Sequence, residues 1–150
     1  MTVALLGVVL GGLLTVFESV QRSATFVQER SETLDEMRIA LDQMTKEIRQ
    51  ALEVESASTA SRLEMTTYIL GVQKQIVYEV TGTTLTKNVN GAGAVPIQTQ
   101  VASTSLFSYT VDASGVIQLV TLDLSVHPKR RPDTTVLLTS EARLRNQVVT

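Results

Sequence analysis

The sequence predicts an α+β fold in which a long N-terminal helix, membrane-spanning and then amphipathic, packs on an antiparallel β-sheet. The first observation is a run of seventeen uncharged residues, Met1 to Phe17, at the start. The second is that no Gly or Pro interrupts residues 18–52. The third is a change after Leu52 to runs rich in Thr, Val, Ile and Tyr, which favour strands. We therefore expect a helical segment at 1–17, its amphipathic continuation at 18–52 and a β-sheet head domain at 53–150.

Residues 1–17 are apolar on every side of the expected helix. About 20 apolar residues are needed to cross a bilayer, so this run fits a short membrane span. A helix buried in a soluble protein and the apolar region of a signal peptide are the alternatives. A signal peptide fits poorly because no Lys or Arg precedes the run. A helix that is apolar all round needs lipid or other helices around it.

A stripe of small residues lies within this segment, at Ala4, Gly7 and Gly11. The two glycines have the G-x-x-x-G spacing that lets membrane helices approach each other closely. We therefore predict that these three residues take part in helix–helix packing.

An apolar stripe with alternating steps of three and four residues marks the amphipathic part of the helix. It consists of Leu34, Met37, Leu41, Met44 and Ile48. This spacing places all five side chains on one helix face. We predict that this face forms a helix–sheet core with the chain's own strands. Upstream of Arg30 the helix is expected to contact other subunits.

Six segments after residue 52 have the alternating pattern of strands: 63–69, 75–80, 84–89, 106–111, 116–126 and 134–145. Loops are expected at 56–61, 88–96 and 127–133, where small and turn-forming residues gather. Short connections favour antiparallel hairpins. A sheet of this kind has an apolar face, which the amphipathic helix would cover.

The composition argues against an enzyme. The chain has no cysteine and a single histidine, His127, which lies in an expected loop. Thiol chemistry and cysteine-ligated metals are therefore excluded, and a transition-metal site is not expected. We predict no catalytic residue, no cofactor and no metal ligand. The net charge of −2 indicates no general attraction to nucleic acid.

One basic cluster, Lys129, Arg130 and Arg131, stands between two prolines. Three charges in such a setting are typical of a solvated turn. The functional alternative is contact with an anion or with DNA. No aromatic residue is interleaved with the cluster, which argues against binding of single strands.

Three stretches carry a resemblance to a known family. They are the opening Met-Thr-Val-Ala-Leu-Leu-Gly-Val-Val-Leu, residues 37–51 with their Arg-Gln-Ala ending, and residues 138–146. Together with the order of elements they resemble the type IV pilins and pseudopilins, in particular minor pilins of the PilW and GspJ-like kind. The likeness is closer in the helix than in the sheet, and it implies a pilin-like fold.

The resemblance implies a structural subunit that takes part in initiating or capping a type IV pilus or a type II secretion pseudopilus. Its partners would be other pilin or pseudopilin subunits, bound through the N-terminal helix, and the inner-membrane assembly machinery. The expected location is the bacterial inner membrane, as a single-pass protein with its head domain outside the cytoplasm, and the cell exterior once assembled. The alternative is a membrane-anchored binding or sensor domain that never polymerises.

The start of the chain departs from the family pattern. Family members begin with a short basic leader, a Gly, Phe-Thr-Leu and a Glu near the mature N-terminus, and this sequence has none of them. The resemblance therefore implies that Met1 corresponds to a position about six residues inside the mature segment of family members. With those six residues added, the apolar run would exceed the ~20 residues of a membrane span.

Overall fold

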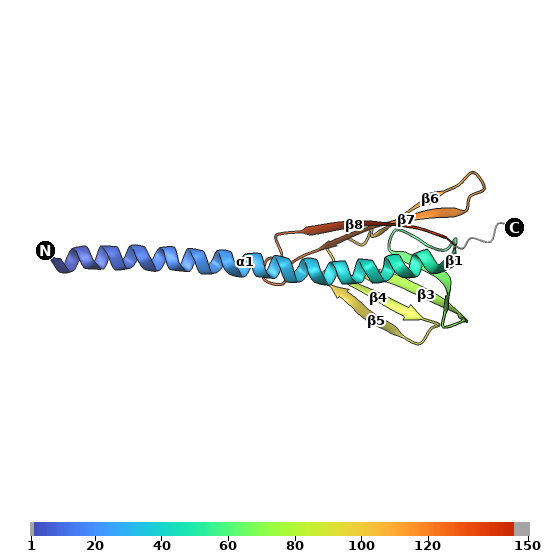
Figure 1. Ribbon diagram of the computed structural model, residues 1–150, viewed down its shortest axis with the longest axis horizontal. Coiled ribbons are helices and arrows are strands. Elements are labelled where there is room, and N and C mark those ends of the chain that lie inside the picture. The colour runs from blue at the N-terminus through green and yellow to red at the C-terminus, as the bar shows by residue number, and fades with distance from the viewer. Residues whose placement is uncertain (1, 146–150) are drawn as a thin grey trace. The chain divides into compact units, whose positions relative to one another are not determined.

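The computed structural model describes the backbone of residues 2–145 and the side chains of residues 16–18, 20, 21, 23 and 25–145. In this part the chain forms one helix and then a succession of strands (Figure 1). The elements are α1 (Thr2–Gln50), β1 (Ala51–Val54), β2 (Arg62–Ile69), β3 (Val72–Thr81), β4 (Thr84–Val89), β5 (Ala94–Thr99), β6 (Phe107–Val111), β7 (Ile117–Val126) and β8 (Val136–Arg143).

The chain divides into two compact units between Glu32 and Thr33. The first unit is the helical stretch of α1 up to Glu32. The second unit contains the remainder of α1 together with all the strands. The last part of the helix therefore belongs to the same unit as the sheets.

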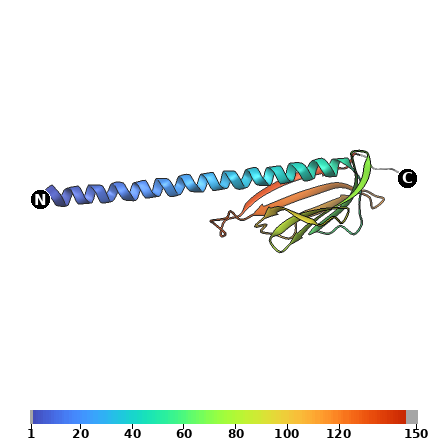
Figure 2. The ribbon, with the colours of Figure 1, turned by 90° about the horizontal axis from the view of Figure 1, so that it is seen from below.

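The strands form two antiparallel sheets (Figure 2). The larger sheet has the order β1-β2-β3-β4-β5 and the smaller has the order β6-β7-β8, so sequential strands are neighbours within each sheet. β2 and β3 are joined by the two-residue turn Leu70-Gly71, whose φ angles are +53° and +77°. Two positive φ values characterise the type I′ turn, which matches the twist of paired strands.

The segment between β5 and β6 connects the two sheets through backbone hydrogen bonds. Val101 forms an isolated bridge with Val126 of β7. On either side of it, the amide of Ala102 donates to Ser125 and the amide of His127 donates to Gln100, at 2.8 and 2.9 Å. This segment continues the pairing of β7 beyond the short strand β6.

A single core joins α1 to both sheets. The buried side chains from α1 lie three or four residues apart, and those from the strands alternate, as each element's period requires. The largest include Met37, Met44, Ile48, Leu63, Met65, Ile76, Tyr78, Leu85, Leu122 and Leu124, all fully buried. Burying one such apolar side chain contributes about 1.5–3 kcal/mol.

The predicted fold class, a membrane-spanning and then amphipathic helix packed on one antiparallel sheet, is wrong. Strands predominate in the described part, and they form two sheets. In the described part of the chain, no helix is both long and apolar enough to cross a membrane. The strands form two sheets because the segment after β5 bridges to β7, and β6, β7 and β8 pair only with one another.

Two strands lie where no strand was predicted. The helix ends at Gln50, and β1 begins at Ala51, inside the predicted helix. The Thr67 hydroxyl donates to the Gln50 carbonyl at 3.2 Å, so a side chain of β2 satisfies a carbonyl at the helix end. β5 overlaps the loop predicted up to Pro96, and its position at a sheet edge is one where proline is tolerated.

Candidate functional site

Among the described side chains of the first unit, four large apolar ones of α1 are exposed. Val16, Phe17, Val20 and Val27 are 62%, 62%, 61% and 64% exposed. At 3.6 residues per turn they lie within a sector of about 100°. Such a sector is the width of the apolar stripe by which a helix normally packs against a partner. We refer to these four residues as the apolar helix face.

A polar stripe runs along another side of the same stretch of helix. Its members are Gln21, Thr25, Gln28 and Glu32. The Thr25 hydroxyl donates to the Gln21 carbonyl at 2.9 Å, and the Gln28 amide donates to the Glu32 carboxylate at 3.0 Å. The polar groups are thus satisfied within the helix, while the apolar helix face has no cover in the described residues.

A partly buried polar cluster holds the last turns of α1 against the larger sheet. The Tyr78 hydroxyl donates to Glu47 Oε2 at 2.6 Å, and Lys87 Nζ donates to Glu47 Oε1 at 2.5 Å. The Lys87 ammonium also lies 5.7 Å from the centre of the Tyr78 ring. Burial, followed by the hydrogen bond to Glu47, raises the pKa of Tyr78 well above its ordinary value. The cluster leaves Glu47 paired on both oxygens, so its role is structural.

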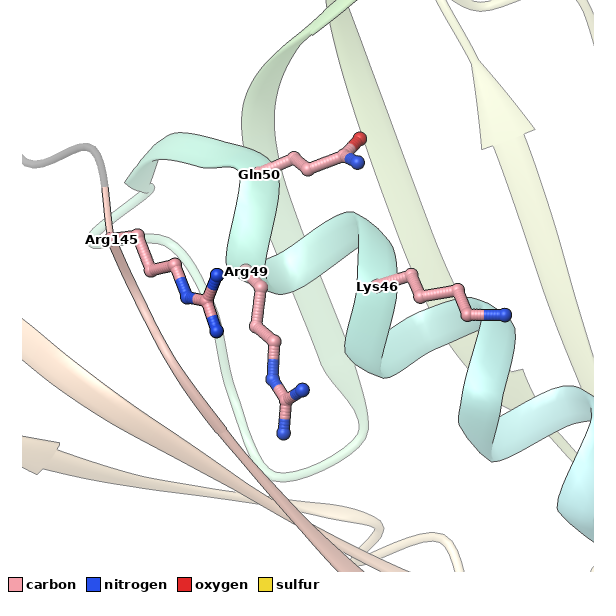
Figure 3. Close-up of a pocket in the computed structure, with 4 residues that line it drawn as sticks. All are labelled: Lys46, Arg49, Gln50 and Arg145. Carbon is pink, nitrogen blue, oxygen red and sulfur yellow. The ribbon is translucent and has the colours of Figure 1, made fainter.

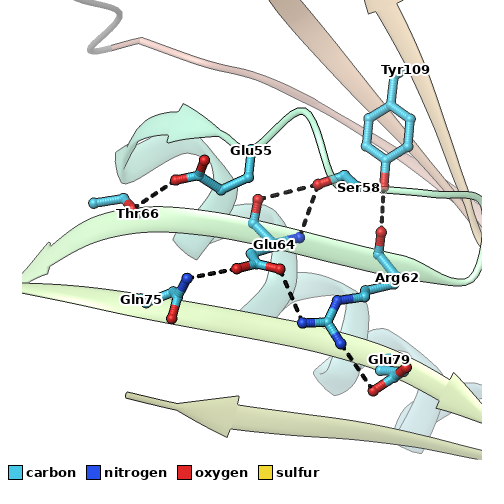
Figure 4. A network of polar contacts seen from close by, with 8 residues as sticks. All are labelled: Glu55, Ser58, Arg62, Glu64, Thr66, Gln75, Glu79 and Tyr109. Atoms are coloured by element: carbon cyan, nitrogen blue, oxygen red, sulfur yellow. Dashed lines mark hydrogen bonds and ion pairs between the residues drawn. The ribbon is translucent and has the colours of Figure 1, made fainter. Parts of the chain in front are cut away.

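A second polar network links the two sheets (Figure 4). The Tyr109 hydroxyl of β6 lies 2.9 Å from the Thr59 carbonyl and 3.0 Å from the Arg62 carbonyl. The Arg62 guanidinium pairs with Glu64 at 3.0 Å and with Glu79 at 3.5 Å. Burial raises the pKa of Tyr109. Because the Arg62 side chain is 38% exposed, its ion pairs contribute little to stability, and the Tyr109 contacts are the structural link.

The structure places the predicted core residues as follows. Met37, Leu41, Met44 and Ile48 are buried in the core, and Leu34 is partly buried against it. Each belongs to the second unit, in which α1 and the strands share one core. The stripe therefore covers the chain's own sheets at these positions.

The small-residue stripe lies outside the residues whose side chains are described. Ala4, Gly7 and Gly11 belong to the backbone of α1. The packing role that the sequence predicts for them remains a prediction.

The basic cluster lies in the loop between β7 and β8, where Lys129, Arg130 and Arg131 are all exposed. The amide of Arg131 donates to the Pro128 carbonyl at 3.0 Å, so the cluster occupies a hydrogen-bonded turn. His127 at the loop's start lies 2.9 Å from the Thr134 carbonyl through Nδ1, a contact that closes the loop.

Sequence reasoning missed the cluster of Glu47, Tyr78 and Lys87. Its members are separated by 31 and 40 residues along the chain, so no local pattern connects them. A weak signal existed, since Tyr78 and Lys87 each stand two residues from apolar residues in their predicted strands and so share the apolar face. Among the described residues, no group of three or more His, Cys, Asp or Glu could hold a metal ion.

Comparison with known proteins adds no assignment to this geometry. No protein-family model, curated protein or solved structure matches the chain.

Proposed function

We propose that this protein is a structural subunit, a minor pilin or pseudopilin, that takes part in assembling a type IV pilus or a type II secretion pseudopilus. The observation that carries the proposal is the apolar helix face of Val16, Phe17, Val20 and Val27. The partners are other pilin or pseudopilin subunits, bound through α1, and the inner-membrane assembly machinery. The assembled protein is then exposed outside the cell.

The apolar helix face supports this proposal because of its size and its position. Each of its side chains leaves more than half of its surface open to solvent, and burying each would contribute on the order of 1.5–3 kcal/mol. The face adjoins the uncharged residues 1–15, which extend the apolar character toward the N-terminus. An apolar helix of another subunit matches a surface of this shape and length.

Apolar side chains are buried in one stretch of α1 and exposed in another, and this difference also supports a subunit that packs against other subunits through its helix. From Met37 to Ile48 the apolar positions are buried against the chain's own strands. From Val16 to Val27 the same kind of side chain is exposed. One helix thus carries an intramolecular apolar stretch and a stretch that needs a partner.

The test is site-specific photo-crosslinking in bacteria that express the full chain and a pilus or pseudopilus assembly system. A photoreactive residue replaces Val20 in one strain and Leu137 in another. Leu137 is a matched control because it is 60% exposed on β8, an element of the second unit. We expect crosslinks to pilin-class subunits from position 20 and few from position 137.

Val20→Glu provides an independent measurement, since a charge on the apolar helix face would oppose burial against another helix. We expect it to reduce incorporation into fibres by about tenfold or more, as a loss of at least ~1.4 kcal/mol implies. Leu137→Glu should leave incorporation nearly unchanged. Absence of pilin-class crosslinks together with normal incorporation of Val20→Glu would overturn the proposal. Crosslinks to proteins of another class would instead support a non-polymerising binding domain.

A further inference from the structure

A pocket of about 390 Å³ lies in the second unit where α1 ends, and its lining is almost entirely cationic. Lys46, Arg49 and Gln50 line it from α1, and Arg145 lines it from the segment after β8 (Figure 3). We call this the cationic pocket. No carboxylate is among its lining residues.

The three cations of the cationic pocket form no ion pair within the described residues. Ion pairs elsewhere in the described part of the chain join Arg38 to Asp35, Arg62 to Glu64 and Glu79, and Lys87 to Glu47. Lys46, Arg49 and Arg145 take part in none of them. Asp42 stands one helical turn before Lys46, but the two side chains do not form an ion pair.

The C-terminal end of α1 accounts for two of the three positive charges in the cationic pocket. The carbonyl groups of a last helical turn carry partial negative charge, and cations such as Lys46 and Arg49 are favourable there. Arg145 is different, because it comes from outside the helix and adds a like charge to the same pocket. Water and salt screen most of the repulsion because these side chains are exposed, and a bound anion would relieve what remains.

The lining chemistry defines the class of anion. Each guanidinium presents a planar set of donors that matches the oxygens of a phosphate or carboxylate group. Lys46 adds a mobile point charge, and the Gln50 side-chain amide adds a neutral donor. Three positive charges match an anion with more than one negative charge better than they match a single carboxylate.

We propose that the cationic pocket of Lys46, Arg49, Gln50 and Arg145 binds a phosphate-class oxyanion. Two sources share this chemistry, namely free phosphate and the phosphate of a lipid headgroup. The inference is independent of the proposed assembly role, because the pocket lies in the second unit and the apolar helix face lies in the first.

The first arm of the test measures binding of inorganic phosphate to the full chain by isothermal titration calorimetry, with the protein held in a neutral detergent. Chloride at the same ionic strength controls for general screening. We expect saturable binding to the wild type. Arg145→Gln should raise the dissociation constant by about tenfold, as expected when a charge-assisted hydrogen bond is lost.

Lys129→Gln is the matched control, since it removes one exposed positive charge outside the cationic pocket. It should leave phosphate binding within about twofold of the wild type, because exposed charges act weakly at a distance. Far-ultraviolet circular dichroism checks that both variants are folded. Arg49→Lys, which keeps the charge but loses the planar donor set, should bind with intermediate affinity.

The second arm measures co-sedimentation of the wild type and Arg145→Gln with vesicles of phosphatidylcholine, with and without phosphatidylglycerol. Retention that needs phosphatidylglycerol and is lost in Arg145→Gln identifies a lipid headgroup as the source. Phosphate binding without such retention identifies the free anion. The proposal is overturned if neither probe distinguishes Arg145→Gln from the wild type, or if Lys129→Gln is the variant that loses binding.

Discussion

Tyr78 donates a 2.6 Å hydrogen bond to the carboxylate of Glu47, a residue that precedes it by 31 positions and lies on another element. The same carboxylate accepts from Lys87 of the neighbouring strand β4. The helix is also tied to the smaller sheet, because the Thr45 and Ser140 hydroxyls lie 3.1 Å apart. The last turns of α1 are therefore held by polar contacts to both sheets as well as by the apolar core.

Removing the Tyr78 hydroxyl tests the strength of this connection. Tyr78→Phe keeps the ring in the core but deletes a hydrogen bond to a charged acceptor. We expect the free energy of unfolding to fall by about 1.5–3 kcal/mol, the usual range for such a bond. Urea unfolding of the full chain in detergent, followed by circular dichroism, measures the change. A loss below about 0.5 kcal/mol would show that water replaces the hydroxyl at Glu47.

Removing the Glu47 charge should be more damaging. Glu47→Gln leaves the ammonium of Lys87, whose side chain is only 15% exposed, without its counter-charge. A buried charge that loses its partner costs about 3 kcal/mol or more. Asp35→Asn is the control, since the Asp35 and Arg38 side chains are 63% and 66% exposed and such a pair is worth about 0–1 kcal/mol. Similar losses in the two variants would contradict the structural role of Glu47.

The buried Tyr78 phenol also predicts how stability changes at high pH. Its pKa in the folded protein lies above the ordinary value of 10.0, because burial and the bond to Glu47 favour the protonated form. The stabilisation is therefore complete below pH 10.0 and is lost as pH rises, since the unfolded chain then releases this proton and the folded protein retains it. Urea midpoints measured from about pH 8 to about pH 11 should fall less steeply in Tyr78→Phe than in the wild type. Equal slopes would mean that Tyr78 does not contribute to the alkaline loss of stability.

The contribution of the helix to the core is tested at Leu41, which is 5% exposed. Leu41→Ala should lower the free energy of unfolding by about 2–5 kcal/mol, through lost burial and the cavity that remains. Ile39 lies two residues earlier and is 70% exposed, so Ile39→Ala should change it by no more than about 0.5 kcal/mol. The contrast between the two variants is the measurement, and a smaller effect at position 41 than at position 39 would reverse the assignment of the helix faces.

The turn at Leu70 offers a variant that should increase stability. Leu70 has a φ of +53° and is 98% exposed, so it adopts a left-handed conformation without any apolar contact in return. Asparagine tolerates this conformation far better, and Asn-Gly is the preferred pair for a type I′ turn. Leu70→Asn should therefore raise the free energy of unfolding by roughly 1 kcal/mol. A decrease would mean that the leucine side chain makes a stabilising contact in solution.

The sequence by itself determined the local elements whose pattern repeats at short range. The steps of three and four residues from Leu34 to Ile48 placed five side chains on one helix face, and four of them are buried. The period-2 runs located β2, β3, β4, β6, β7 and β8 to within a few residues. These successes share a cause, because the periods of helix and strand are set by local backbone geometry.

The tertiary structure alone decided how the strands are distributed and how the helix ends. Nothing in the alternation of β6, β7 and β8 shows that they form a sheet separate from β1–β5. The conversion of residues 51 and 52 from predicted helix to strand depends on pairing with β2, and the ladder places Ala51 opposite Thr67. Glu47, Tyr78 and Lys87, like Arg49 and Arg145, meet only after distant segments have paired. Pairing energies and burial depend on partners far along the chain, so a local sequence pattern cannot reveal them.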